Sequence, residues 1–377
     1  MPTRVVALGA GFGGMELSTM LSEELGDLAE VTLIDSADAF VFGFAKLDVL
    51  FGRTSLDSVR LPYSSFRHPN VRLLRETITA IDPVAKVVTT DAGTHEADIL
   101  VVALGADYDI AATPGLAEAG NEFYSVAGAA RLGKILATAQ AGDYVIGVCD
   151  APYKCPPAPS ECALLLHNHL TARGVREDST ITFTIPLPSP VPPAPQASRV
   201  LLEEFAERDI RFVPGVRIAS LDGERGAVLL DDGQELPYDV FLGVPKHQAP
   251  RVVLDSGMAE DGYIPVDSAT LASRFPGVYA VGDVATAGVP KAGAFSEGAA
   301  KVVARSIIAQ LRGAEAPAPY DGIGICYVEF GDDRVGRVRV DFLSGPRPTG
   351  SLDGPSTGYA AEKAEWASSR RARWFGL

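Results

Sequence analysis

Residues 4–14 read RVVALGAGFGG, and the order of residue types in this stretch decides the fold. A short apolar run is followed by a turn with four glycines, and a helix is expected from Met15 to Leu25. The run VTLID at 31–35 predicts a second strand that ends in an acid. A strand, a glycine turn, a helix and a strand of this size predict a βαβ unit that binds a dinucleotide.

Three glycines of the turn have separate tasks in such a unit. Gly9 allows the tight turn, Gly11 lets a pyrophosphate approach the backbone, and Gly14 lets the helix pack closely on the strand. The N-terminus of the helix supplies free N–H groups and a partial positive charge. Asp35, at the end of the second strand, can accept hydrogen bonds from a ribose diol.

Composition narrows the class of protein. The chain has 377 residues, 47% of them hydrophobic, which suits two or three α/β domains. A net charge of −15 argues against a nucleic-acid partner, because its phosphates would be repelled. Four cysteines are too few for a secreted disulfide scaffold.

No signal peptide and no run of about 18 apolar residues is visible, so a cytoplasmic location is expected, with peripheral membrane attachment as the alternative.

A second βαβ unit is expected in the middle of the chain, but its turn lacks the glycines. Strands are predicted at 144–148 and 180–185, with a helix from about Ser160 to Arg173 between them. Residues 145–150 read VIGVCD, without a glycine triplet. Neither a pyrophosphate nor a ribose would be recognised there, so NADH is predicted to be a poor electron donor.

Other segments are less specific. Residues 71–74 and 86–90 are predicted to form a small antiparallel insertion. Six prolines between Pro186 and Pro195 predict an extended surface loop, because proline cannot donate to a sheet. After this loop, Ser198 is expected to cap a helix that runs to about Glu207.

The stretch that replaces the second glycine turn reads APYKCPPAPSEC at 151–162. Cys155 lies just before a helix that Ser160 is expected to cap, and both the helix N-terminus and the adjacent Lys154 favour a thiolate. Two prolines follow the cysteine and stiffen the loop. Glu161, in the first helical turn, can accept a proton from a thiol or from hydrogen sulfide. The stretch therefore predicts thiol chemistry.

Two later motifs resemble the second and third flavin signatures of the two-dinucleotide-binding-domain flavoproteins. They are DILVVALGA at 98–106, which contains Gly105, and VYAVGD at 278–283, which ends in Asp283. The resemblance implies FAD, with Asp283 on its ribityl or pyrophosphate side and the backbone near Ile78 beside the adenine.

The resemblance also implies the fold, which is α/β with tandem Rossmann-like dinucleotide-binding domains and a small C-terminal α+β domain. The expected domains are 1–115 with 256–313 for FAD, 116–255 for the degenerate second unit, and 314–377 for the C-terminal domain.

Within these flavoproteins, the chain resembles the sulfide:quinone oxidoreductase and flavocytochrome c sulfide dehydrogenase group. The motifs are YKCPP at 153–157 with Glu161, PKAG at 290–293 with Glu297, and Cys326-Tyr327. The resemblance implies an oxidoreductase in which Cys155 and Cys326 form a redox disulfide against the flavin. Sulfide, or a related small sulfur nucleophile, would be the substrate, and quinone or another acceptor would take the electrons.

The PKAG motif offers residues for tuning the flavin. Lys291 is expected to face the N1–C2=O edge and to stabilise negative charge on reduction. Gly293 belongs to the same cofactor set, and the helix that begins near Phe295 would aim its N-terminus at the same edge.

Two departures from the group refine these expectations. Many quinone-reducing members carry a third cysteine in a Ser-x-Cys segment, where this chain has Ser125-Val126-Ala127, so a two-cysteine mechanism is favoured. Flavocytochrome-type members attach FAD through a cysteine near the position of Phe42, and no cysteine precedes Cys149 here. The FAD is therefore expected to be non-covalent.

The other cysteines and the tail leave alternatives open. Cys149 and Cys162 lack the paired spacing of zinc sites, so they are expected to be packing residues and no metal is predicted. The tail at 362–377 is expected to be a short helix that packs on its own protein, and contact with an anionic bilayer near a quinone is the alternative. A homo-oligomer is also open.

Two rival functions remain, a type II NADH dehydrogenase-like flavoenzyme and a flavin-bearing redox sensor. The candidate residues are Cys155, Cys326 and Glu161 for catalysis, and Gly9, Gly11, Gly14, Asp35, Ile78, Gly105, Asp283, Lys291 and Gly293 for the cofactor.

Overall fold

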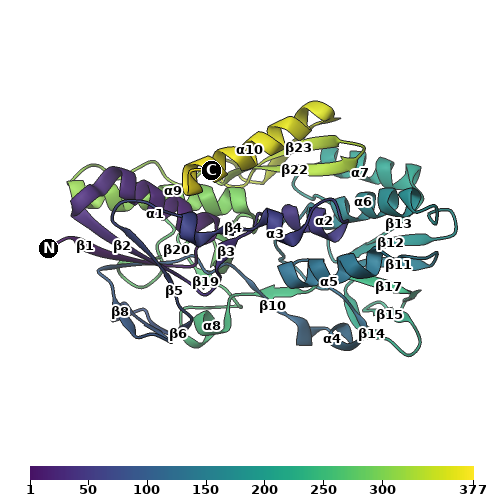
Figure 1. Cartoon of the computed structure of the whole chain (residues 1–377), viewed down its shortest axis with the longest axis horizontal. Helices are drawn as coiled ribbons and strands as arrows, with labels where there is room; N and C mark the ends of the chain where they lie inside the picture. Colours follow the sequence, from purple (N-terminus) through teal and green to yellow (C-terminus); the bar gives the residue numbers. More distant parts are fainter.

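Two parallel β-sheets, one in each half of the molecule, frame the computed structural model, which covers residues 1–377 (Figure 1). A three-stranded antiparallel sheet and the last helix lie along one side of both halves. This architecture confirms the predicted α/β fold class with two dinucleotide-fold units. The exact domain limits stay a prediction.

The first sheet grows outward from the N-terminal strand, in the order β20-β9-β1-β2-β5, with all neighbours parallel. Its strands are β1 (Thr3–Leu8), β2 (Ala29–Asp35), β5 (Val71–Arg75), β9 (Ile99–Val102) and β20 (Val278–Ala280). Helices α1 (Phe12–Leu25) and α9 (Gly293–Arg312) lie against each other over it (Figure 1). β9 is buried along its whole length, as expected for a strand covered on both faces.

The prediction that 71–74 belongs to a small antiparallel insertion is wrong. β5 pairs in parallel with β2, with Val71 opposite Val31. The antiparallel insertion consists of β6 (Ile78–Asp82), β7 (Val87–Thr90) and β8 (Thr94–Glu96). A short apolar run before a turn is compatible with a parallel or an antiparallel sheet. Which of the two it joins depends on the strand that it meets in the folded protein.

The second sheet has the order β13-β12-β11-β17 and is also fully parallel. Its strands are β11 (Asp143–Val148), β12 (Thr180–Ile185), β13 (Ile210–Pro214) and β17 (Val240–Val244). Helix α6 (Ala158–Ala172) follows β11, and α7 (Pro195–Glu207) follows β12. Both parallel connections match the βαβ pattern expected for the middle of the chain.

Neither serine expected to cap these helices does so. α6 begins two residues before Ser160, and α7 begins three residues before Ser198. Both helices have a proline in their first turn, where its missing N–H costs nothing. The prolines therefore mark the helix starts more accurately than the serines.

The proline-rich loop between β12 and α7 is only partly a surface loop. Val191 and Ala194 are buried in the core that surrounds the second sheet. Ser198 also faces this loop, because its hydroxyl accepts a hydrogen bond from the Val191 N–H at 3.0 Å. The loop thus packs on the molecule rather than extending into solvent.

Shorter elements lie between the strands of the two sheets along the chain. The strands are β3 (Ala39–Phe40), β4 (Leu61–Pro62), β10 (Asp107–Asp109), β14 (Ile218–Asp222), β15 (Ala227–Leu230), β16 (Glu235–Pro237), β18 (Lys246–Gln248), β19 (Ile264–Pro265) and β21 (Ala285–Thr286). The helices are α2 (Ala45–Leu50), α3 (Leu56–Val59), α4 (Leu116–Ala119), α5 (Val126–Leu136) and α8 (Arg251–Asp255), with 3-10 turns at 26–28, 63–65, 110–112 and 282–284. β10 and β18 pair where the chain passes between the halves.

The C-terminal part consists of the antiparallel strands β22 (Ile323–Gly331), β23 (Arg334–Asp341) and β24 (Thr349–Ser356), followed by α10 (Thr357–Phe375). α10 runs over the other elements, and the C-terminus lies near α1 and α9 (Figure 1). Trp374 near its end is only 1% exposed, and its Nε1 donates to Glu16 Oε2 at 2.9 Å. The tail thus docks on its own protein, as expected.

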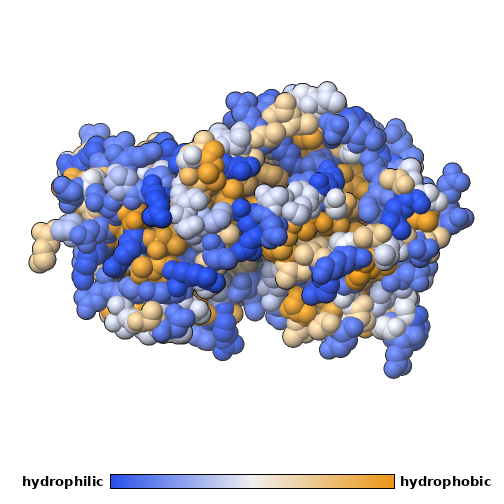
Figure 2. Space-filling view, viewed as in Figure 1, coloured by the Kyte–Doolittle hydropathy of each residue, from blue (hydrophilic) through white to orange (hydrophobic).

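The visible face in Figure 2 is mostly hydrophilic, with apolar patches between the charged groups. Cys149 and Cys162 are buried among apolar side chains, which fits their expected role as packing residues. None of the helices combines the length and the apolar character that a membrane span requires.

Candidate active site

A cavity of about 320 Å³ is lined by residues from both halves of the chain. Gly11, Phe12 and Gly13 come from the first glycine turn, and Cys155 and Glu161 come from the second unit. Further predicted residues on its walls are Gly105, Asp283, Lys291 and Gly293. The structure thus brings seven of the twelve predicted site residues to one cavity.

The first glycine turn has the shape that a bound pyrophosphate requires. Gly9 has φ of +96°, and a Cβ on Gly14 would lie 1.9 Å from the Gly9 carbonyl oxygen. A Cβ on Gly11, in contrast, would meet no protein atom within 4 Å. The space in front of Gly11 is therefore open, as expected where phosphates approach the backbone. Gly9 and Gly14 form the turn without lining the cavity.

Asp35 stabilises the same turn from the end of β2. Its carboxylate accepts hydrogen bonds from the N–H groups of Ala10 at 2.7 Å and Ala37 at 2.8 Å. Each carboxylate oxygen keeps a further lone pair for a ribose hydroxyl. Asp35 lies outside the cavity wall, and so does Ile78, which lies on β6 of the antiparallel insertion.

Asp283 presents an unused acceptor to the cavity. Its Oδ1 is buried and has no hydrogen-bond partner, and burial raises the pKa of its carboxyl group. An orphaned acceptor of this kind fits a ligand that carries hydroxyl groups. With the open space at Gly11, it shows that the residues present fit a dinucleotide such as FAD.

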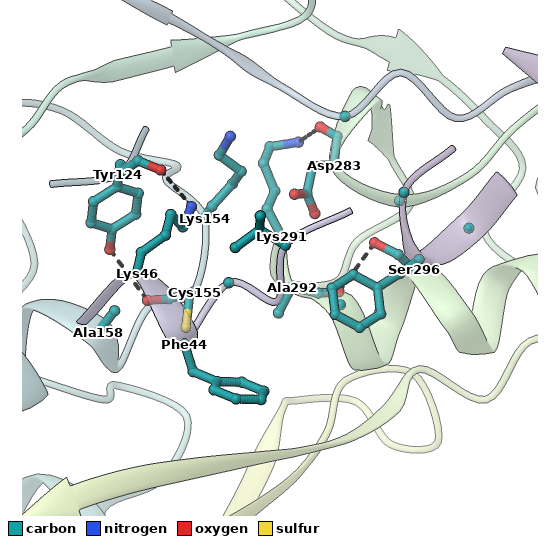
Figure 3. A pocket seen from close by; sticks show the side chains of 18 of the residues that line it. Phe44, Lys46, Tyr124, Lys154, Cys155, Ala158, Asp283, Lys291, Ala292 and Ser296 are labelled. Carbon is teal, nitrogen blue, oxygen red and sulfur yellow. Dashed lines mark hydrogen bonds between the residues drawn. The ribbon is translucent and has the colours of Figure 1, made fainter. Parts of the chain in front are cut away.

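Lys291 crosses the cavity wall beside Asp283 (Figure 3). Its Nζ donates to the backbone oxygens of Asp283 at 2.7 Å and Ala285 at 3.3 Å, and it lies 3.4 Å from the centre of the Tyr263 ring. Burial lowers the pKa of Lys291 to about 8, which the negative charge of Asp283 partly opposes. Its predicted contact with the flavin edge stays a prediction.

Cys155 is fixed in the loop between β11 and α6. It has a positive φ of +48°, and its N–H donates to the Lys291 oxygen at 2.7 Å. The Tyr124 hydroxyl donates to the Cys155 oxygen at 3.4 Å (Figure 3). Because the backbone is held on both sides, the sulfur has a defined position on the cavity wall.

The prediction that Cys155 is a ready thiolate is wrong. Burial raises its pKa well above that of an ordinary thiol, and the negative charge of Glu161 raises it further. Lys154 does not offset this rise, since its Nζ donates to the Ala106 oxygen at 2.7 Å. Desolvation thus raises the pKa of Cys155 more than the helix N-terminus and the neighbouring cation lower it.

Cys326 lies on β22 and is not part of the cavity wall. It is nevertheless close enough to Cys155 for a charge on Cys326 to raise the pKa of the Cys155 thiol. Burial, followed by the charge of Glu161, raises the pKa of Cys326 to about 12. All four cysteines are free thiols in the structure.

Glu161 adjoins both cysteines from the first turn of α6. It is 2% exposed, and its Oε1 accepts a hydrogen bond from the Glu329 N–H at 3.0 Å. The Lys363 Nζ lies 4.0 Å from the same oxygen and also pairs with the Glu329 carboxylate. Burial raises the pKa of Glu161 to about 7, and the charge of Lys363 limits the rise.

Sequence reasoning missed two lysines at this site. Lys46 on α2 lines the cavity, and Lys363 on α10 reaches Glu161 from the C-terminal helix. Neither belongs to a motif, and both come from elements remote from Cys155 in sequence. The only available signal was the aromatic and basic character of the tail, which did not indicate a contact with Glu161.

Comparisons with known proteins agree with this geometry. A model of the pyridine nucleotide-disulphide oxidoreductases matches residues 3–306. The mitochondrial sulfide:quinone oxidoreductase of Mus musculus is 24% identical over 365 residues, covering 93% of this chain and 80% of that protein. An NADH dehydrogenase-like protein of Mycobacterium tuberculosis is 28% identical over 302 residues, covering 76% and 73%. The solved sulfide:quinone oxidoreductase of Aquifex aeolicus superposes with a TM-score of 0.82 at 24% identity, covering 97% and 90%.

These matches confirm the resemblance that the motifs indicated. The structural likeness shows the same fold over nearly the whole chain. The family model spans both parallel sheets and most of α9, and so contains the glycine turn, Cys155 and Lys291. An FAD-dependent oxidoreductase is the class of enzyme to which these findings assign the protein. With its family model matched over residues 3–306, the chain belongs to the pyridine nucleotide-disulphide oxidoreductase family.

Proposed function

We propose that the protein oxidises sulfide, or a related small sulfur nucleophile, through Cys155 and Cys326 and passes the electrons to non-covalent FAD. One observation carries the proposal. Cys155 and the buried carboxyl group of Glu161 lie on the wall of a cavity that the glycine turn also lines, and Cys326 on β22 is close enough to Cys155 to affect its pKa. A purely structural cysteine would need neither the carboxyl group nor the cavity.

The chain's own residues suffice to hold the cofactor. Gly11 would leave room for the pyrophosphate, Asp283 would offer its orphaned oxygen to the ribityl chain, and Lys291 and Gly293 would lie at the flavin end. When bound, the flavin would accept an electron pair from the thiols and deliver it to quinone or another acceptor. No cysteine precedes Cys149, so the N-terminal segment offers no thiol for a covalent link.

The reaction at sulfur begins from the Cys155–Cys326 disulfide. Hydrosulfide attacks one cysteine sulfur, the S–S bond breaks, and that cysteine becomes a persulfide while the other leaves as a thiolate. Glu161, in its ionised form, takes the proton that hydrogen sulfide releases. A second hydrosulfide attacks the outer sulfur of the persulfide and carries it away as hydrodisulfide, which frees that cysteine as a thiolate. The two thiolates then re-form the disulfide and release two electrons, which bound FAD would accept.

Serine variants test this assignment. Cys155→Ser and Cys326→Ser are each expected to lose flavin reduction by sulfide in anaerobic stopped-flow experiments, while FAD content stays normal. Cys149→Ala is the matched control, because Cys149 is buried among apolar side chains remote from the cavity wall. Undiminished reduction of the flavin in either serine variant would reject the proposal.

Quinone as the acceptor and peripheral contact with a membrane through α10 belong to the same proposal. Trp374 and Phe375 are buried against the first half of the molecule, so contact with a bilayer would have to use other residues of the helix. The exposed Arg371 is one such residue. A cytoplasmic location and a homo-oligomer stay predictions.

An NADH dehydrogenase is the second candidate, since the Mycobacterium tuberculosis relative is NADH dehydrogenase-like and 28% identical. Against it, the loop after β11 carries Cys155, whose N–H is bonded to Lys291. A pyrophosphate would need a glycine turn with free N–H groups at this place. We therefore still predict that NADH is a poor donor.

A further inference from the structure

Two lysines reach the Cys155 side of the cavity without meeting a carboxylate. Lys46 extends from α2, and its Nζ donates to the Tyr124 oxygen (Figure 3). Lys154 extends from the cysteine loop, donates to the Ala106 oxygen at 2.7 Å and lies 4.3 Å from the centre of the Tyr108 ring. Both are half-buried and line the cavity, and neither forms an ion pair.

The two ammonium groups repel each other. Burial and the positive charge of Lys154 lower the pKa of Lys46 to about 8. The acids that oppose this effect are Cys155, then Glu122 and Asp283. Half-buried cations that repel each other and form no ion pair with an acid are unfavourable, and a bound anion would relieve the repulsion.

We propose that Lys46 and Lys154 form an anion-binding site beside Cys155, and that its ligand is hydrosulfide. The inference rests on the proposed function, because it names the form in which the sulfur substrate is held. It also gives the site a selectivity. Two ammonium charges attract a monovalent anion and do nothing for a neutral thiol of similar size.

The surroundings favour a small ligand. Tyr108 and Tyr124 wall the site, and the Tyr124 hydroxyl is already bonded to the Cys155 oxygen. His247 packs edge-on against both rings, and burial keeps it neutral by lowering its pKa to about 3. His247 therefore adds no charge, and the charged groups near the two lysines are Asp107, Glu122, Asp283 and Lys291.

Azide serves as the probe, since it is a small monovalent anion without a sulfur atom. We expect it to bind the flavin-loaded protein in calorimetric titrations at low salt and to compete with sulfide. Lys46→Met and Lys154→Met are each expected to weaken azide binding about tenfold, which corresponds to about 1.4 kcal/mol. Lys46→Arg keeps the charge and is expected to retain binding. Lys134→Met, an exposed lysine on α5, is the matched control.

The pH dependence gives a second readout that a structural role would not produce. Lys46 carries its charge below its pKa and loses it above, so azide affinity is expected to fall as the pH rises through about 8. The fall should be smaller in Lys46→Met, in which Lys154 and Lys291 still titrate. If one methionine variant fails to fold, the other variant and the pH series of the wild type still test the anion site.

The outcomes separate this inference from the proposed function. Equal azide affinity in the wild type and both methionine variants, or no binding to the wild type, would overturn the anion site even if sulfide reduces the flavin. In another outcome, azide binding depends on the lysines but sulfide leaves the flavin oxidised. The anion site would then stand, but hydrosulfide would be rejected as its ligand.

Discussion

Glu161 carries a carboxyl group that burial keeps largely protonated below neutral pH, since its pKa is raised to about 7. A base works only in its ionised form, so flavin reduction by sulfide is expected to rise about tenfold per pH unit below 7 and to level off above it. Glu161→Gln removes the base, so the rate at pH 8 is expected to fall about 10²–10⁴-fold. A rise that remains in this variant reflects the ionisation of hydrogen sulfide itself.

A stopped-flow pH series on both proteins measures this effect. Glu203→Gln, an exposed acid on α7, is the matched control and is expected to behave as the wild type. A rate at pH 8 in Glu161→Gln equal to that of the wild type would assign the proton transfer to another group.

At the residue scale, local motifs were informative and distant contacts were not. Cys155 and Glu161 were found because proline, cysteine and acid occur together in one short stretch. Their raised pKa values were missed, because burial depends on β22 and α10, which the stretch does not contain. Lys46 was missed for the same reason, since its neighbours come from other parts of the chain.

Among the elements, the first glycine turn allows a matched pair of substitutions. A Cβ on Gly11 would meet no protein atom, whereas a Cβ on Gly14 would collide with the Gly9 oxygen at 1.9 Å. Gly11→Ala is therefore expected to fold normally but to lose FAD, because the methyl group occupies the space for the pyrophosphate. Gly14→Ala is expected to lower the thermal stability of the protein itself.

Flavin absorbance of the purified variants and melting temperatures of their FAD-free forms distinguish these effects. A Gly11→Ala protein that keeps its full flavin content would contradict the assignment of the turn to the pyrophosphate.

Helix α10 connects the C-terminal end to the cofactor half. Trp374 packs edge-on against Phe12, which lines the cavity, and donates to the buried Glu16. Trp374→Ala is expected to destabilise the protein by about 3–5 kcal/mol. Trp374→Phe keeps most of the packing but loses the hydrogen bond to a carboxylate, so a cost of about 1.5–3 kcal/mol is expected.

Denaturant unfolding of the two variants measures this difference. Stability equal to that of the wild type in Trp374→Ala would mean that the helix does not dock in solution.

Element prediction succeeded where periodicity and turn chemistry agreed. β12 has its expected limits, and β11 starts one residue early. Strand pairing was less predictable, as β5 shows, because a short apolar run does not specify its partner. The helix caps at Ser160 and Ser198 were wrong, because prolines already supplied the first turns.

On the scale of the whole molecule, the fold class and the cavity followed from three ordered motifs that the tandem fold brings together. The sequence did not predict which C-terminal elements pack against the second unit. β22 and α10 place Cys326, Glu329 and Lys363 against the second unit, although the family model ends at residue 306. The surroundings of Glu161 therefore include side chains from the C-terminal part as well as from the second unit.

The central claim is that sulfur, and not a nicotinamide, delivers electrons to this cavity. It is tested most directly by mixing the purified, flavin-loaded protein anaerobically with sulfide and, separately, with NADH, while the oxidised flavin absorbance is followed. We predict rapid bleaching with sulfide and slow or no bleaching with NADH. Rapid bleaching with NADH and none with sulfide would contradict the assignment.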